Sequence, residues 1–443
     1  MPYIPHTPEE IREMLDVVGL PDVDALFAEI PPELRPQSFD LPKGATEMAV
    51  RLAMERLAAK NRIDMVSFLG GGFYDHYVPA ASDMLLSRGE FYTAYTPYQP
   101  EASQGTLQAI FEYQTAVTRL LDMECSNAGV YDGGTALYEA LMMAVRHTRR
   151  KKAVVSETVS PIYRIVLATY TKNLHLDLVV VPHKNGLDDF EGLAAAIDGD
   201  TAALVVQNPN FFGNVQDFTE LFATARAKGA VSVMSCYPVL QTVLRTPGAM
   251  GADIATAEGQ SLGLPLSFGG PYLGVMTCKK TMIRQMPGRI AGRTHDAKGR
   301  TGYVLTLQAR EQHIRRQKAT SNICSNQALC ALRALINVCL VGNEGLTRQA
   351  ARSIENANYA AWKLCSIPGV SLLNAAPFGN EFAAVFPVNA KQVVRTLMDD
   401  GIVPGFPLGR YYKGLENALL ICCTEKHERA DIDRLARRLE RAL

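Results

Sequence analysis

Two hydrophobic patterns alternate along the chain from residue 125 onward. Short apolar runs rich in valine and alanine predict buried strands over residues 151–157, 175–182, 201–209, 230–236, 252–259 and 272–278. Between several of them, apolar residues at helical spacing predict helices over residues 160–173, 188–197 and 217–229. Strands that alternate with helices imply right-handed crossovers and a mostly parallel sheet covered on both faces. The middle of the chain is therefore predicted to be one α/β sandwich, with ligands at the carboxyl ends of its strands.

The two ends of the chain follow other patterns. Residues 7–59 have short helical patterns, and "TPEEIREMLDVVG" begins with Thr7 as a predicted N-cap. An amphipathic helix is predicted within residues 101–122. After a helical stretch near 325–345, strands near 381–388 and 417–425 and helices at 389–401 and 427–443 predict a small α+β unit. We therefore expect an N-terminal helical arm (1–75), a large α/β domain (76–315) and a small C-terminal α+β domain (316–443).

Charge and cysteine content narrow the choice of partners. The 443 residues contain 45 basic and 45 acidic side chains, so nothing favours a nucleic acid or a membrane surface as a partner. The start of the chain lacks the apolar segment of a secretory signal, and no apolar run approaches a membrane span, which predicts a cytoplasmic protein. The nine cysteines form no CxxC pair or Cys/His cluster, so we expect reduced thiols and no metal site.

A glycine-rich turn precedes the helical pattern of "YDGGTALYEALMMAVR", residues 131–146. Gly133, Gly134 and Thr135 stand where the first N–H groups of a helix point outward and favour an anion. These three residues could cradle a phosphate. The alternative is an ordinary glycine turn with Thr135 as the helix cap.

Two further stretches carry candidate site residues. The loop "FYTAYTPYQPEASQG", residues 91–105, places several aromatic rings and Glu101 on a segment stiffened by two prolines. It could form a pocket wall, or it is a packed surface loop in which Glu101 caps the following helix. Lys318, Thr320, Ser321 and Asn322 precede a helical run, where anion-binding or capping residues stand.

Six phrases taken in order carry a family resemblance that spans nearly the whole chain. They are "YTAYTPYQPEASQGTLQAIFEYQT", "YDGGTALYEA", "SETVSPIYR", "AEGQSLGLPLSFGGPYLG", "TSNICSNQAL" and "CCTEKHERADID". Together they resemble the P-protein of the glycine cleavage system, and more narrowly its first, or α, chain in organisms that divide the enzyme between two chains. The resemblance implies the fold of fold-type-I pyridoxal-phosphate enzymes, with a seven-stranded sheet. It also implies a reaction in which glycine loses carbon dioxide and its aminomethyl group passes to the lipoyl arm of the H-protein.

Two departures from the family pattern concern the cofactor. Gln260 stands where the β chain of the family has the lysine that holds pyridoxal phosphate, and an amide nitrogen cannot attack an aldehyde. The strand "AVSVMSCYP" contains no carboxylate, although such enzymes place an aspartate there under the ring nitrogen. The resemblance therefore implies that the β subunit holds the cofactor covalently, that Gly133, Gly134 and Thr135 are vestigial, and that this chain alone is inactive.

The resemblance also indicates what this chain gives its partner. Because fold-type-I sites lie at subunit interfaces, some side chains are expected to line the β subunit's pocket: Tyr95, Thr96, Tyr98, Gln99, Glu101, Thr320, Ser321 and Asn322. The family suggests an α2β2 assembly that acts on glycine and on lipoylated H-protein. Two alternatives are a pure scaffold and a self-sufficient lyase that uses Lys279 or Lys280. The lyase is disfavoured because these lysines follow a strand instead of preceding the glycine turn.

Overall fold

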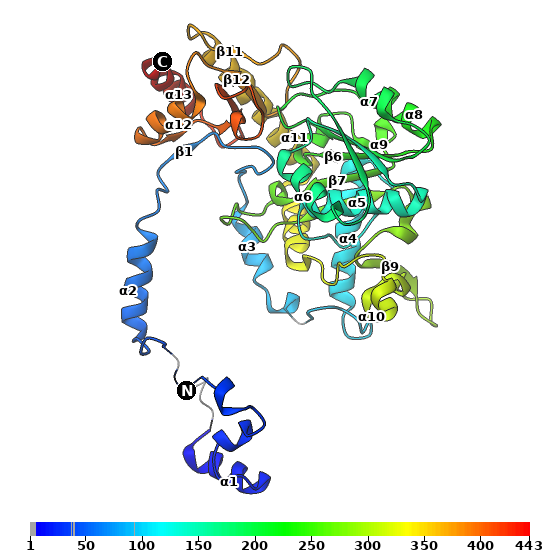
Figure 1. The fold of residues 1–443 in the computed structure, drawn as a ribbon, viewed down its shortest axis with the longest axis vertical. Helices are drawn as coiled ribbons and strands as arrows, with labels where there is room; N and C mark the ends of the chain where they lie inside the picture. Colours follow the sequence, from blue (N-terminus) through cyan, green and yellow to red (C-terminus); the bar gives the residue numbers. More distant parts are fainter. Residues whose placement is uncertain (1–5, 37, 39, 93) are drawn as a thin grey trace. The chain divides into compact units, whose positions relative to one another are not determined.

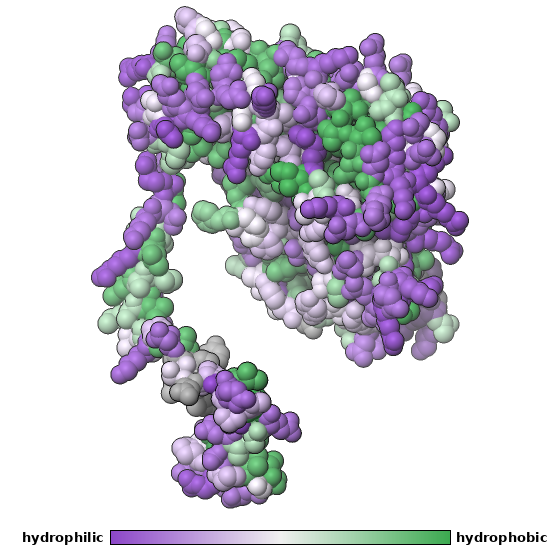
Figure 2. Space-filling model, viewed as in Figure 1, coloured by the Kyte–Doolittle hydropathy of each residue, from purple (hydrophilic) through white to green (hydrophobic). Residues whose placement is uncertain are grey.

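The computed structural model describes residues 6–36, 38, 40–92 and 94–443, and it divides the chain into two compact units, residues 1–63 and 64–443 (Figure 1). The first unit contains α1 (Pro8–Val18), η1 (Asp24–Phe27), η2 (Pro32–Leu34) and α2 (Glu47–Ala58). Thr7 caps α1 as predicted, since its hydroxyl accepts the Glu10 N–H at 3.3 Å. None of the residues in these four elements is buried, and apolar side chains lie on the unit's surface (Figure 2).

The second unit is built on a seven-stranded sheet of strand order β2-β8-β7-β6-β5-β3-β4. Neighbouring strands from β4 to β7 are parallel, whereas β8 is antiparallel to β7 and to β2. All six predicted strands are confirmed, and the sheet matches the size implied by the family resemblance. The strands are β2 (Cys125–Ser126), β3 (Lys152–Ser156), β4 (Asp177–Val181), β5 (Thr201–Asn208), β6 (Val231–Cys236), β7 (Ile254–Glu258) and β8 (Gly274–Cys278).

Helices cover both faces of this sheet, as the alternation of strands and helices predicts (Figure 1). On β5, Leu204 and Val206 join a cluster with side chains of α4, α7, α8 and α11, while Ala203 and Val205 join one with α5 and α6. Successive residues of one strand therefore reach opposite layers of core. These helices are α4 (Gln104–Leu121), α5 (Gly133–Thr148), α6 (Pro161–Thr171), α7 (Phe190–Ala196), α8 (Thr219–Ala227) and α11 (Ala328–Cys365).

The C-terminal part has the α+β character expected of it. An antiparallel sheet of order β11-β12-β15-β14 packs with α12, α13 and the C-terminal end of α11 in a separate hydrophobic cluster. In addition, β1 pairs in parallel with β13, so the segment that follows the first unit joins this part of the chain. The predicted boundaries at 75 and 315 stay predictions. The elements are β1 (Val66–Ser67), β11 (Ser371–Leu372), β12 (Glu381–Val385), α12 (Ala390–Asp399), β13 (Ile402–Val403), β14 (Phe406–Pro407), β15 (Ala418–Cys422) and α13 (Arg429–Ala442).

Two features go beyond the predicted pattern. The 38 residues of α11 form two helical segments that meet at a kink at Gly342, whose backbone is not helical (φ 65°). A hairpin of β9 (Ile290–His295) and β10 (Thr301–Thr306), unpredicted, packs on α4. The remaining elements are α3 (Ala80–Leu86), η3 (Gly89–Phe91), η4 (Val239–Thr242), α9 (Pro247–Met250), η5 (Gln260–Leu262), η6 (Lys280–Gln285), η7 (Gln308–Arg310), α10 (Gln312–Arg315), η8 (Arg316–Lys318) and η9 (Leu408–Arg410).

Helix α11 is also long and apolar enough to cross a membrane by length and composition. Its most apolar 18-residue window has a mean hydropathy of 1.4, and 28% of that window is buried. The same helix packs against α3, α4 and α13 of this fold, as a core helix does. One such helix is weak support for a membrane span, and the absence of a membrane partner stays a prediction.

The cysteines and the possible metal ligands can be located in the structure, and the absence of a metal site stays a prediction. All nine cysteines are free. Among the described residues, no group of three or more histidine, cysteine, aspartate or glutamate side chains could hold a metal ion.

Candidate functional site

The start of α5 meets the end of β7 at the carboxyl edge of the large sheet. The backbone N–H of Gly133 donates to Oε2 of Glu258 at 2.8 Å, and that of Thr135 donates to Oδ1 of Asp132 at 2.7 Å. Asp132 is therefore the N-cap of α5, and the alternative that made Thr135 the cap is wrong. Two N–H groups that could have bound a phosphate are already paired with carboxylates of this chain.

Glu258 is the central polar side chain of this edge. It is buried, and besides Gly133 its carboxylate accepts the N–H groups of Gln260 at 3.0 Å and Leu273 at 3.2 Å. Burial raises the pKa of Glu258 to about 7, and the three N–H donors oppose that rise. The carboxylate thus connects α5, η5 and the segment that leads into β8.

Little space remains above the glycine turn. A Cβ atom on Gly133 would lie 3.0 Å from the Cβ of Glu258 and would clash with the hydroxyl of Tyr163. A Cβ on Gly134 would lie 3.3 Å from the ring of Tyr163. The two glycines are required for close packing against Glu258 and Tyr163, and this packing accounts for them without a ligand.

Gln260, in η5, is fully engaged by the backbone of the same chain. Its Oε1 accepts the N–H of Tyr74 at 2.8 Å, while its Nε2 donates to the carbonyl oxygens of Tyr74 at 3.0 Å and Leu264 at 2.8 Å. Only 1% of the residue is exposed. The next residue, Ser261, is also buried and carries no amine either. No side chain of η5 can form a Schiff base.

Strand β6, in the centre of the sheet, has no carboxylate to offer a pyridine nitrogen. All six of its residues are buried, and it ends at Cys236. The next residue, Tyr237, packs its ring against Tyr74 with 4.2 Å between ring centroids and hydrogen-bonds to His76. Aromatic packing occupies the position where an aspartate would stand.

These contacts test whether the cofactor of the fold family fits this edge of the chain. The phosphate position is taken by Glu258, the lysine position offers an amide, and the ring position lacks its counter-charge. The residues present do not fit a covalently held pyridoxal phosphate.

Lys279 and Lys280, the alternative nucleophiles, lie at the opposite edge of the sheet. Strand β8 runs antiparallel to β7, so that Gly274 pairs with Glu258 and Cys278 pairs with Ile254. The chain therefore leaves β8 at the amino end of β7. There the ammonium of Lys279 donates to Oδ1 of Asp253 at 2.6 Å. This geometry contradicts a self-sufficient lyase built on either lysine.

The structure brings two of the predicted site stretches together. The hydroxyl of Tyr95 hydrogen-bonds to that of Ser325 at 2.7 Å. The buried guanidinium of Arg289 donates to the Tyr98 hydroxyl at 3.1 Å and to Oδ1 of Asn326 at 3.4 Å. The aromatic loop therefore lies beside the segment that leads into α11.

Within the aromatic loop, several predicted residues point to solvent. Tyr95 is 87% exposed and Tyr98 is 48% exposed. Gln99 and Glu101 are exposed, and Thr96 is partly buried. Helix α4 begins after Ser103 with no side-chain cap, so the alternative role of Glu101 as a cap is wrong. These side chains are available to another molecule, and their contribution to a partner site stays a prediction.

The residues before α11 are held inside this chain to different degrees. Ser321 donates its hydroxyl to Oε1 of Glu139 at 2.6 Å, while Thr320 and Asn322 hydrogen-bond to η7 and α10. The N-cap of α11 is Gln327, whose side chain makes no capping bond, so these residues do not cap the helix as one alternative had it. Ser321 is the least available of the three to a partner.

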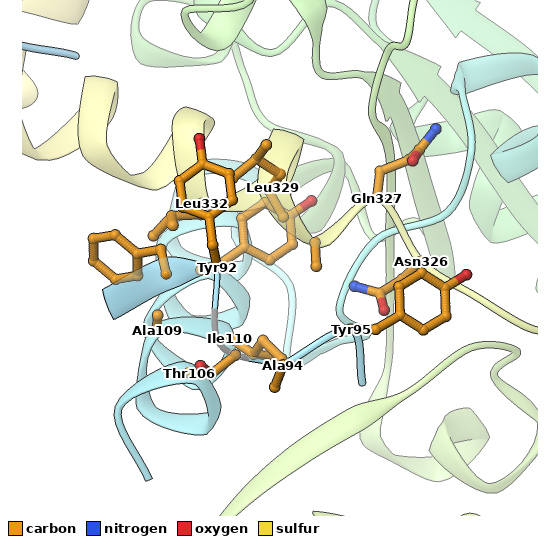
Figure 3. A pocket seen from close by; sticks show the side chains of 14 residues that line it. Tyr92, Ala94, Tyr95, Thr106, Ala109, Ile110, Asn326, Gln327, Leu329 and Leu332 are labelled. Carbon is orange, nitrogen blue, oxygen red and sulfur yellow. The ribbon is translucent and has the colours of Figure 1, made fainter. Parts of the chain in front are cut away.

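A cavity of about 450 Å³ opens between the aromatic loop, α4 and the first turns of α11 (Figure 3). Tyr95 and Asn326 lie together on one side, and Tyr92 lies near Leu332 on the other. The hydroxyl of Tyr113, on the cavity wall, is buried and has no hydrogen-bond partner among the described residues. The cavity wall is mostly apolar, and a second pocket that shares Phe91, Ala109 and Leu332 with it extends along α11 to Leu340.

Sequence reasoning missed three residues of the carboxyl edge: Asp132, Tyr163 and Glu258. A signal for two of them was present. Asp132 directly precedes the glycines at a helix start, which is the N-cap position, and Glu258 is the next-to-last residue of a predicted buried strand, at the edge where ligands bind. Tyr163 gave no local signal.

The comparisons with known proteins agree with this architecture. The family model of the glycine cleavage system P-protein matches residues 1–439. A probable glycine dehydrogenase (decarboxylating) subunit 1 from Solidesulfovibrio magneticus is 90% identical over the full length of both chains. One of the same description from Maridesulfovibrio salexigens is 66% identical and covers 96% of each chain.

Solved structures support the same relationship. A crystal structure of glycine decarboxylase (P-protein) of the glycine cleavage system, in inhibitor-bound form, is 44% identical and covers both chains completely with a TM-score of 0.94. A glutamate decarboxylase from Lactobacillus brevis, 15% identical with a TM-score of 0.68 over 93% of this chain and 95% of its own, shares the fold alone. The fold is that of fold-type-I pyridoxal-phosphate enzymes, and the chain belongs to the glycine cleavage system P-protein family.

Proposed function

We propose that this chain is the cofactor-free subunit 1 of a two-chain decarboxylating glycine dehydrogenase. The name of its relatives implies a second subunit, and the family and fold link the assembly to pyridoxal phosphate. In the proposal, subunit 2 holds the cofactor, and the assembly decarboxylates glycine and passes the aminomethyl group to lipoylated H-protein. The observation that carries the proposal is the amine-free η5, where Gln260 is hydrogen-bonded to the backbone of its own chain.

What this chain does in the assembly follows from its exposed side chains. We propose that side chains of the aromatic loop reach the partner's pocket, where hydroxyls, an amide and a carboxylate can orient a substrate or hold a proton: Tyr95, Thr96, Tyr98, Gln99 and Glu101. Thr320, Ser321 and Asn322 are proposed as weaker contributors. The apolar cavity beside this loop and the exposed apolar side chains of α11 are compatible with coverage by a second chain.

The first test asks whether release of carbon dioxide from glycine requires both chains. Purified subunit 1 with glycine, pyridoxal phosphate and lipoylated H-protein is expected to release no carbon dioxide, because η5 offers no amine to the cofactor. Addition of subunit 2 is expected to start the reaction. Release of carbon dioxide by the isolated chain, or a lysine of this chain labelled by borohydride reduction with the cofactor, would refute the proposal.

The second test separates a contributor from a scaffold. In the two-chain assembly, Tyr95→Phe combined with Glu101→Gln is expected to lower kcat/KM for glycine by about 10- to 100-fold, because both changes remove groups that position a substrate or proton. The control pairs Tyr170→Phe with Glu191→Gln, which alters an exposed tyrosine and an exposed glutamate on α6 and α7, outside the aromatic loop. Full activity of the first double variant would support the scaffold alternative.

A further inference from the structure

The anion-binding end of α5 is already filled by this chain. A 16-residue helix carries partial positive charge at its first N–H groups, which favours an anion there. In this chain the N–H of Gly133 points to Glu258, and that of Thr135 points to Asp132. Two carboxylates therefore supply the negative charge that a bound phosphate would supply.

The position of Glu258 also excludes a second anion. Its carboxylate lies 2.8 Å from the N–H of Gly133, so a phosphate on the same donor would overlap with it. A phosphate placed beside it would face a like charge in a buried, low-dielectric place, which is strongly unfavourable. The ring of Tyr163 closes the remaining approach to the glycines.

Three hydrogen bonds hold the carboxylate in place. Oε2 accepts from Gly133, while Oε1 accepts from Gln260 and Leu273. These donors belong to the start of α5, to η5 and to the segment before β8, so Glu258 cannot move aside without leaving several buried N–H groups unpaired. The carboxylate is a fixed part of the site.

We propose that Glu258 is a built-in substitute for the phosphate group at the start of α5, which keeps the site closed to phosphorylated ligands. The inference rests on contacts within this chain and holds whichever protein the chain pairs with. Glu258 is thus a positioning residue that fastens η5 and the segment before β8 to α5.

The test measures binding of inorganic phosphate to the full-length chain. Burial raises the pKa of Glu258 to about 7, so the carboxyl is ionised at about pH 8. At this pH the unaltered chain is expected to show no binding up to about 10 mM phosphate. Glu258→Ser removes the charge and frees the space, so this variant is expected to bind phosphate at least about tenfold more tightly than the unaltered chain. Calorimetry or the phosphate-dependent rise in Tm reports the affinity.

Two further variants test the specificity of the effect. Glu139→Ser removes another buried carboxylate of α5, remote from the helix start and bonded to Ser321, and it should gain no phosphate binding. Glu258→Gln keeps the site filled, because its amide oxygen can still accept the Gly133 N–H, and it should bind phosphate more weakly than Glu258→Ser. Equal gains in all three variants would overturn the proposal.

A measurement on the unaltered chain keeps the proposal testable even if Glu258→Ser does not fold. With ¹⁵N-glycine labelling, the amide resonance of Gly133 should not move when phosphate is added, since that N–H is bonded to Glu258. A saturable shift of this resonance below about 1 mM phosphate would overturn the proposal. An unshifted resonance supports it.

Discussion

Replacing Gln260 with alanine is expected to lower the free energy of unfolding of the chain by about 4 kcal/mol. The change removes three side-chain hydrogen bonds, and it leaves the N–H and carbonyl of Tyr74 and the carbonyl of Leu264 without partners in the buried interior. Each unpaired buried group costs about 1–3 kcal/mol. Urea unfolding of the purified chain, followed by circular dichroism, measures the difference.

Gln241→Ala is the matched control for this prediction. Gln241 is buried to a similar degree, but its side chain makes one hydrogen bond, from Nε2 to the carbonyl of Tyr237 at 3.0 Å. We expect this control to lose about 1–2 kcal/mol. If Gln260→Ala costs no more than the control, Gln260 does not fasten η5 to the segment around Tyr74.

Replacing Glu381 with glutamine is expected to stabilise the chain at high pH and to have little effect at low pH. Glu381 is buried in β12, where its carboxylate accepts the N–H of Gly71 at 2.9 Å and the hydroxyl of Tyr74 at 2.8 Å. Burial raises its pKa from 4.5 to about 7. Between these pH values the folded chain binds more protons than the unfolded chain. The free energy of unfolding of the native chain therefore falls as the pH rises from about 4.5 to about 7.

A glutamine at this position does not take part in that titration. The stability of Glu381→Gln relative to the native chain should therefore grow by about 3 kcal/mol between about pH 4.5 and pH 8, at about 1.4 kcal/mol for each unit of the pKa difference. Urea unfolding at several pH values measures it. Glu344→Gln, which changes an exposed glutamate on α11, should show no such growth. A stability difference for Glu381→Gln that stays constant with pH would contradict the raised pKa.

The sheet and its helices were predictable because their signals are local. Buried parallel strands such as β5 and β6 are continuous apolar runs, and α4 keeps one apolar face, so periodicity alone locates them. The β9–β10 hairpin was not predicted from the sequence because its strands are only partly buried and mix polar with apolar residues. The second helical segment of α11 was not predicted because Gly342 resembles a helix stop, and the structure does break the helix there before a new segment begins.

The candidate site was predictable only in part, for a different reason. The absence of an amine near Gln260 can be seen in the sequence, but the contact between Gly133 and Glu258 spans 125 residues and depends on how β7 lies against α5. The contact between Tyr95 and Ser325 spans 230 residues. Such pairs follow from tertiary packing, which periodicity and local motifs do not encode.

The internal pairing around Gln260 and Glu258 bears on how this protein matures. A ligand site usually keeps polar groups unpaired until its ligand arrives, and such a protein gains stability from loading. Here those groups are saturated as soon as the chain folds. Folding of this polypeptide should therefore be indifferent to the supply of vitamin B6.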